Sequence, residues 1–196
     1  MIPATCRAAL LFGLVALAAI SVRATTVLPL TFEQLVSGAS LVFEGETVDV
    51  RPRASNERDG LMIVTDVTFR VVRALKGFPS PMIRLSFVGG TVGDRTLTVE
   101  GMPAFTRGDR DVVFAHEGDG HVSAIVGLMY GRFPITYDAP TGETFVRRFD
   151  GLPIRALADV ASQIRRPLLA MDRPMALSAF EAAIAAEVAR QRGGPR

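Results

Sequence analysis

LMIVTDVTFRVVRAL, residues 61–75, is the stretch of sequence that decides the fold. From residue 63 to residue 71 every second side chain is β-branched or aromatic, and polar ones fill many of the positions between, as expected when a strand turns alternate residues to opposite faces. One face would carry Val67 and Phe69, and the other Asp66 and Arg70. Branched and aromatic residues, which favour strands, dominate the stretch. It therefore predicts a strand and points to a mainly β fold.

Further strand patterns lie on both sides of this stretch. They cover residues 41–50, 83–87, 97–99, 111–115, 122–126, 132–137 and 144–149, with Gly, Pro and Asp turn signals between them. The polar run 51–60, which contains Pro52 and ends in Asp-Gly, predicts a solvated loop. The acids Glu44 and Glu46 alternate along 41–50 and are expected to face solvent. Short strands at this spacing predict a small barrel or an OB-like β domain.

Helical patterns are confined to the two ends of the domain. Thr31 and Gln34 have capping-box spacing, and Gly38 follows where a short helix would end. Near the C-terminus, the Ala-rich segments 155–165 and 177–191 both have helical period.

The second C-terminal segment carries an apolar stripe. Phe180, Ile184 and Val188 recur every four residues, so we expect this helix to dock on the β domain. The expected organisation is a signal peptide at 1–24, a β-barrel-like domain at 25–153, a C-terminal helical segment at 154–192 and a disordered tail at 193–196.

The first 24 residues have the three parts of an export signal. Arg7 supplies a positive charge, residues 8–20 form an apolar run, and Ala24 ends a small-residue cleavage sequence. The run is shorter than the ~20 apolar residues that a membrane span requires, so we expect a periplasmic or secreted protein without stable membrane insertion. Cleavage would also remove Cys6, the one cysteine, leaving no disulfide and no thiol chemistry.

Charge excludes one class of partner. The formal net charge of +2 includes Arg7 and Arg23, so basic and acidic residues balance in the expected mature chain. The remaining Lys and Arg residues form no cluster. Nucleic-acid binders need such a basic surface, and we therefore expect no nucleic-acid partner.

The irregular region 89–110 is the expected contact surface. Loops held by a rigid β scaffold often carry binding, and this region combines glycines with apolar side chains that follow no strand period. The candidate binding residues are Gly89, Gly90, Arg95, Met102, Pro103 and Phe105. An alternative is that Phe105 closes one end of the barrel, because aromatic side chains are usually buried.

No catalytic motif is complete. A Gly-x-Ser-x-Gly elbow is missing, and the glycines at 89–93 lack the Gly-Lys-Ser/Thr ending of a phosphate-binding loop. We therefore expect no catalytic residues and no cofactor. His116 and His121 flank a polar turn and would need further ligands to hold a metal, so a solvated hairpin turn is the favoured interpretation.

Several short motifs resemble those of a group of uncharacterised exported bacterial β-domain proteins. They are FEQLV (32–36), VFEGE (42–46), LKG (75–77), GG (89–90), GMPAF (101–105) and GDRDVVF (108–114), and the likeness covers about residues 30–134. In outline this region also looks like the OB-fold barrel of tissue inhibitors of metalloproteinases. Those inhibitors chelate zinc through an amino-terminal cysteine, which the expected mature chain lacks, so the resemblance implies a fold and not their mechanism.

These observations predict an exported, non-enzymatic binding or interaction module. Its ligand is open, with an extracytoplasmic protein as the leading candidate. The alternative is a metal-binding protein or metal-dependent hydrolase that uses His116 and His121.

Overall fold

The computed structural model describes residues 30–57, 60–116, 123–161 and 173–193. The expected export signal, His121 and residues 194–196 of the expected tail lie outside these ranges.

Six strands form one antiparallel sheet in the order β3-β2-β1-β6-β7-β8, and β4 and β5 pair separately. The strands are β1 (Leu41–Glu57), β2 (Gly60–Lys76), β3 (Met82–Val88), β4 (Gly90–Val92), β5 (Arg95–Leu97), β6 (Arg110–Ala115), β7 (Arg132–Asp138) and β8 (Glu143–Val146). The helical elements are α2 (Phe32–Gly38), η1 (Leu128–Gly131), η2 (Leu157–Asp159) and α3 (Leu177–Gly193). The mainly β fold with terminal helices is confirmed.

The sheet is open, which corrects the expectation of a closed barrel. β3 and β8 stand at its two ends and do not pair with each other in the described part of the chain. Residues 175–176 cover the outer edge of β8 instead, through a bridge between Phe145 and Ala176 and a hydrogen bond from the Val146 N–H to the Met175 carbonyl. A strand edge that is already paired cannot close a barrel.

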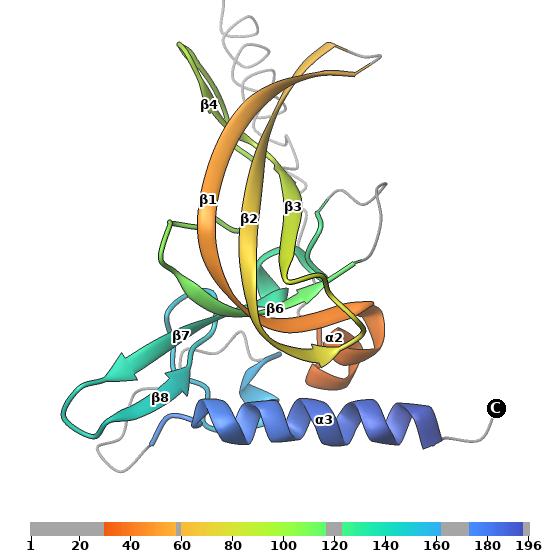
Figure 1. Ribbon diagram of the computed structural model, residues 1–196, viewed down its shortest axis with the longest axis vertical. Helices are drawn as coiled ribbons and strands as arrows, with labels where there is room; N and C mark the ends of the chain where they lie inside the picture. The colour runs from red at the N-terminus through yellow and green to blue at the C-terminus, as the bar shows by residue number, and fades with distance from the viewer. Residues whose placement is uncertain (1–29, 58–59, 117–122, 162–172, 194–196) are drawn as a thin grey trace, which may run out of the picture.

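β1 and β2 form a long curved hairpin that dominates the view in Figure 1. Their pairing continues to Glu57 and Gly60, so the loop expected at 51–60 is wrong for its described residues. The polar composition of this part reflects exposure, because β6 pairs with β1 only as far as Glu46. Pro52, which lacks an N–H, is tolerated where one strand edge is unpaired. Arg53 contributes an ion pair of 2.8 Å with Asp66 on β2.

Three other strand predictions differ from the structure. The strand expected at 97–99 is displaced, because β5 covers Arg95–Leu97. Residues 123–126 make only isolated bridges, at Ser123 and Ile125, in place of a strand at 122–126. The Ser123 hydroxyl accepts a hydrogen bond from the Ile125 N–H at 3.1 Å, and such local bonds compete with a sheet ladder. β8 ends at Val146, although the pattern predicted a strand to residue 149.

The alternation predicted for residues 61–75 is confirmed by burial. Ile63, Val67 and Phe69 are buried, whereas Arg70 on the opposite face is exposed. In the centre of the sheet both faces are covered, because β1 and β6 contribute alternate residues to two apolar cores. The first core includes Phe114 and packs against α2 and α3.

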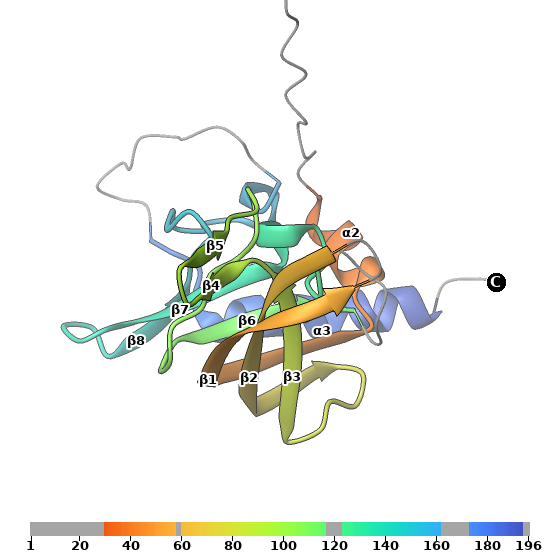
Figure 2. The same cartoon turned by 90° about the horizontal axis from the view of Figure 1, so that it is seen from above.

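The second core lies on the other face of the sheet. Its aromatic members are Phe43, Phe69, Phe87 and Phe105. The β4–β5 hairpin stands beside the main sheet on its own, as Figure 2 shows. The second core includes Phe105, so it supports the loop region expected to bind a ligand.

α3 confirms the predicted C-terminal helix and its apolar stripe. Phe180, Ile184 and Val188 are buried in the first core, and α3 itself runs beneath the sheet in Figure 1.

The helix predicted at 155–165 is wrong over its described part, where only η2 forms. There the Asp159 carboxylate accepts hydrogen bonds from the N–H groups of Arg155 and Ala156 at 2.9 and 3.1 Å, which closes a tight turn.

None of the described helices has the length and apolar character needed to cross a bilayer.

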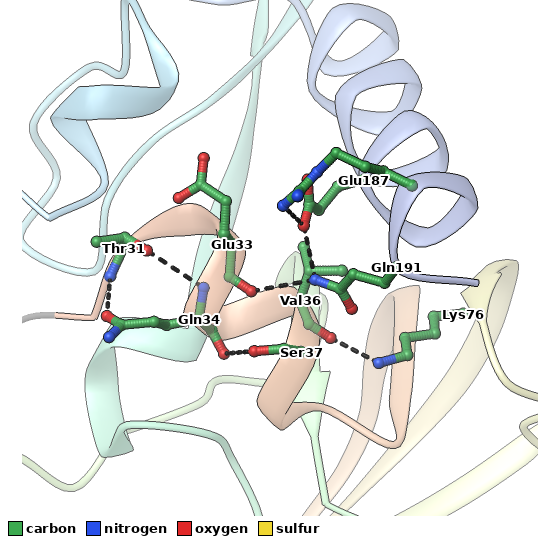
Figure 3. A network of polar contacts seen from close by, with 9 residues as sticks. Thr31, Glu33, Gln34, Val36, Ser37, Lys76, Glu187 and Gln191 are labelled. Atoms are coloured by element: carbon green, nitrogen blue, oxygen red, sulfur yellow. Dashed lines mark hydrogen bonds and ion pairs between the residues drawn. The ribbon is translucent and has the colours of Figure 1, made fainter. Parts of the chain in front are cut away.

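α2 is held at a corner between β2 and α3, as Figure 3 shows. Its predicted capping box is present: the Gln34 N–H donates to Thr31 Oγ1 at 3.2 Å, and the Thr31 N–H donates to Gln34 Oε1 at 2.8 Å. Lys76 Nζ donates to the Val36 carbonyl at 2.6 Å, satisfying a group left open at the C-terminal end of the helix. Gln191 of α3 donates to the Glu33 carbonyl at 3.3 Å. The short helix is thus tied to two other elements.

Candidate functional site

A groove of about 350 Å³ lies beneath the β4–β5 hairpin. Its walls come from β1, β2, β3, the hairpin itself and the segment 98–105. The lining residues are Val50, Thr65, Val67, Phe87, Val88, Gly89, Gly90, Thr91, Thr96, Leu97, Thr98, Val99, Met102, Pro103, Ala104 and Phe105. The structure therefore brings together five of the six candidate binding residues. The sixth, Arg95, is exposed on β5 and does not line the groove.

Gly89 and Gly90 connect β3 to the hairpin and fix its position. Their φ angles are +116° and +126°, a region that L side chains rarely adopt. Thr65 Oγ1 donates to the Gly89 carbonyl at 2.7 Å, and the Gly89 N–H donates to the Ile63 carbonyl at 2.8 Å. A Cβ at Gly90 would lie 2.4 Å from Thr65 Oγ1. The two glycines thus allow the hairpin to approach β2 closely.

Phe105 forms part of the groove and also belongs to the second core. Its ring centroid lies 5.1 Å from that of Phe69 and 5.3 Å from that of Phe87, and the residue is 9% exposed. The burial agrees with the interpretation that Phe105 closes one end of the β domain. A contact role for its small exposed surface stays a prediction.

Arg132 holds the wall that carries Phe105. Its guanidinium carbon lies 4.3 Å above the Phe105 ring, and its Nη1 donates to the Ala104 carbonyl. Nε donates to Asp111 at 2.8 Å, and Nη2 donates to Asp109 at 2.9 Å. Cation–π and charge-assisted contacts from one planar group therefore fix the segment 104–109 against the sheet.

Asp111 is the buried anchor of this arrangement. It is fully buried, and this burial raises the pKa of its carboxyl, against the opposing effect of Arg132. Removing one partner of a buried ion pair leaves an uncompensated charge. Sequence reasoning missed both residues as part of the site. Each residue stands at the edge of an apolar strand pattern, which was the one signal that the sequence offered. Nothing in the sequence indicated that Asp111 and Arg132 face each other.

The chemistry of the groove is neutral. None of the lining residues named above carries a charge, and their polar side chains are threonine hydroxyls. Thr65 is already bonded to Gly89, and Thr91 and Thr96 lie 3.0 Å apart, oxygen to oxygen. A mostly apolar surface with a few hydroxyls suits an uncharged ligand, because burying an unpaired ion is costly.

A larger hollow of about 510 Å³ lies against the β7–β8 hairpin. Its lining mixes carboxylates, guanidinium groups and hydroxyls, among them Asp138, Glu143, Arg147 and Arg173. None of the candidate binding residues lines it. Arg147 is partly engaged, since its Nε donates to Thr136 Oγ1 at 3.1 Å and its Nη1 donates to the Gly151 carbonyl at 3.0 Å.

Only one of the two histidines of the metal-binding alternative lies within the described residues. His116 directly follows β6, and its N–H donates to the Ala124 carbonyl at 2.9 Å, which ties together the two sides of the expected hairpin. His121 lies outside the described residues. Within the ranges that the structure describes, no three His, Cys, Asp or Glu side chains gather in a way that could hold a metal ion.

Comparison of the chain with protein-family models, with curated proteins and with solved structures finds no match.

Proposed function

We propose that the protein is an exported, non-enzymatic binding protein whose groove receives an uncharged, apolar segment of an extracytoplasmic partner protein. The observation that supports this most is the neutral lining. The lining residues offer no charged or metal-coordinating side chain to compensate a buried phosphate, carboxylate or metal ion.

The residues that surround the groove are held in place, so a ligand can bind without a large rearrangement of the protein. Its floor is the packed aromatic core around Phe105, one wall is fixed by Arg132, and the hairpin is tied to β2 through Thr65. A site that is already ordered loses less conformational entropy when it binds. The volume lies near the lower end of the ~300–1,000 Å³ typical of ligand pockets. It is suited to one apolar anchor of a partner, the kind of contact that dominates protein interfaces.

The export part of the proposal rests on residues 1–24. The resemblance to exported bacterial β-domain proteins agrees with it.

Site-specific photocrosslinking in the native envelope tests the proposal. A photoreactive amino acid at Leu97 should form an adduct with a discrete polypeptide. Val99→Arg, which adds a charge to the groove, should abolish the adduct, because a buried unpaired charge is costly. Val72→Arg is the matched control, since Val72 is 50% exposed and lies outside the groove, and it should leave the adduct unchanged.

Two results would contradict the proposal. An adduct that persists in the Val99→Arg protein would place the contact outside the groove. No protein adduct at all, with both variants folded, would exclude a protein ligand at this site.

A further inference from the structure

The hollow against the β7–β8 hairpin is a second candidate site, separate from the groove. The hairpin projects from the side of the sheet in Figure 1, and the hollow beside it has a volume of about 510 Å³. Its lining shares no residue with that of the groove. Two acids, Asp138 and Glu143, and two bases, Arg147 and Arg173, line it. Unlike the groove, this hollow therefore offers charges of both signs to a ligand.

The pairing of β7 with β8 arranges this lining along one face of the hairpin. Asp138 lies opposite Glu143, and Thr136 lies opposite Phe145. Residues two apart in a strand share a face, so these four side chains stand on the same side. Arg147 continues that face, because its Nε donates to Thr136 Oγ1 at 3.1 Å. The face runs from two acids at the tip of the hairpin, past Phe145, to an arginine at its base.

The second arginine joins the basic end of this face. Ala176 forms an antiparallel bridge with Phe145 at the outer edge of β8. Residues that precede Ala176 therefore run alongside those that follow Phe145, which places Arg173 toward Arg147. The acids and the bases of the hollow are thus separated along the hairpin, with an aromatic side chain between them.

The four charged side chains do not neutralise one another. Glu143 and Arg147 are four residues apart in the sequence, which corresponds to about 13 Å along a strand. The Asp138 carboxylate accepts a hydrogen bond from the Thr141 hydroxyl at 2.9 Å, but neither acid has an ion-pair partner in the described part of the chain. Like charges directly opposite each other on paired strands repel. A ligand with a cationic group at the tip and an anionic group at the base would compensate both ends.

We propose that this hollow binds a short peptide with free termini, its ammonium group at Asp138 and Glu143 and its carboxylate at Arg147 and Arg173. Three or four extended residues span about 10–14 Å, which matches the separation of the two charged ends. A single amino acid, whose two charges are one residue apart, is too short. The planar fork of arginine suits a terminal carboxylate, and Phe145 offers apolar surface to the side chains between the two ends.

An NMR titration of the purified mature protein with tetra-alanine tests the proposal. The peptide with free termini should give saturable shifts in the backbone amides of β7 and β8. Acetylating its amino terminus should weaken binding by about three- to fivefold, as expected for the loss of one solvent-exposed ion pair. Amidating its carboxyl terminus should weaken binding by a similar factor.

Matched variants connect each end of the peptide to its proposed partner. Glu143→Gln should weaken the binding of tetra-alanine but not of the acetylated peptide, which has no ammonium group to lose. Arg173→Gln should likewise weaken tetra-alanine but not the amidated peptide. Glu100→Gln is the control, since Glu100 is an exposed acid outside the hollow, and it should bind all three peptides as the wild type does.

Three results would overturn the proposal. The first is the absence of saturable shifts with tetra-alanine. The second is a Glu143→Gln protein that binds the acetylated peptide as weakly, relative to the wild type, as it binds the free one, because a damaged fold and not a lost ammonium contact would then explain the effect. The third is binding of cadaverine, a diamine without a carboxylate, as tight as that of tetra-alanine, which would indicate a site for cations alone.

Discussion

Phe180→Ala should be among the most damaging single substitutions in the chain. Phe180 is fully buried, and its ring centroid lies 5.0 Å from that of Phe133, 5.7 Å from that of Phe32 and 6.4 Å from that of Phe114. Removing a fully buried aromatic side chain loses about 1.5–3 kcal/mol of transfer free energy. The cavity and the lost ring contacts add to this, so the total should be about 3–5 kcal/mol.

The matched control is the same substitution at Phe78, which is 98% exposed in the loop between β2 and β3. Phe78→Ala should change the free energy of unfolding by less than about 0.5 kcal/mol. In a urea titration with a slope of about 2 kcal/mol/M, Phe180→Ala should lower the midpoint by roughly 2 M, and Phe78→Ala should leave it nearly unchanged. Equal shifts for the two variants would refute the assignment of α3 to the core.

Three other predictions concern the site and its alternative. Gly90→Ala should destabilise the protein by about 1–3 kcal/mol in a denaturant titration, because of its positive φ and the nearby Thr65 hydroxyl, whereas Gly93→Ala, with open space around it, should cost less. Arg132→Ala should cost about 3–5 kcal/mol in the same assay by leaving a buried aspartate unpaired; a loss below about 1 kcal/mol would mean that the network does not hold the groove wall. Metal analysis of the purified mature protein should find no stoichiometric zinc, and one equivalent that is lost in His116→Ala would favour the metal-binding alternative.

Local patterns were enough to predict much of the fold. The alternation in residues 61–75 and the apolar stripe of 177–191 both report which face is buried, and β2 and α3 bear them out. The run 51–60 misled because an exposed pair of strands has the same polar composition as a loop. Its pairing depends on β2, a partner that composition does not reveal.

The candidate site was predicted only in part, for a similar reason. Gly89 and Gly90 have a recognisable local signature, but the contact between Arg132 and Asp111 joins strands 21 residues apart in the chain. Glu44, which was expected to face solvent, is 3% exposed and forms an ion pair with Arg110 on β6. Contacts of this kind arise from tertiary packing, which neither periodicity nor spacing reports.

The most direct test of the central claim is a fluorescence titration with Nile red, an uncharged apolar dye, on the purified mature protein. We expect saturable binding at one site in the wild type and in Val72→Arg. In Val99→Arg the affinity should fall by at least about tenfold, or about 1.4 kcal/mol, with an unchanged unfolding midpoint showing that this variant is folded. Equal affinity in all three proteins, or no saturable binding in the wild type, would contradict the claim that the neutral groove beneath the β4–β5 hairpin is a binding site.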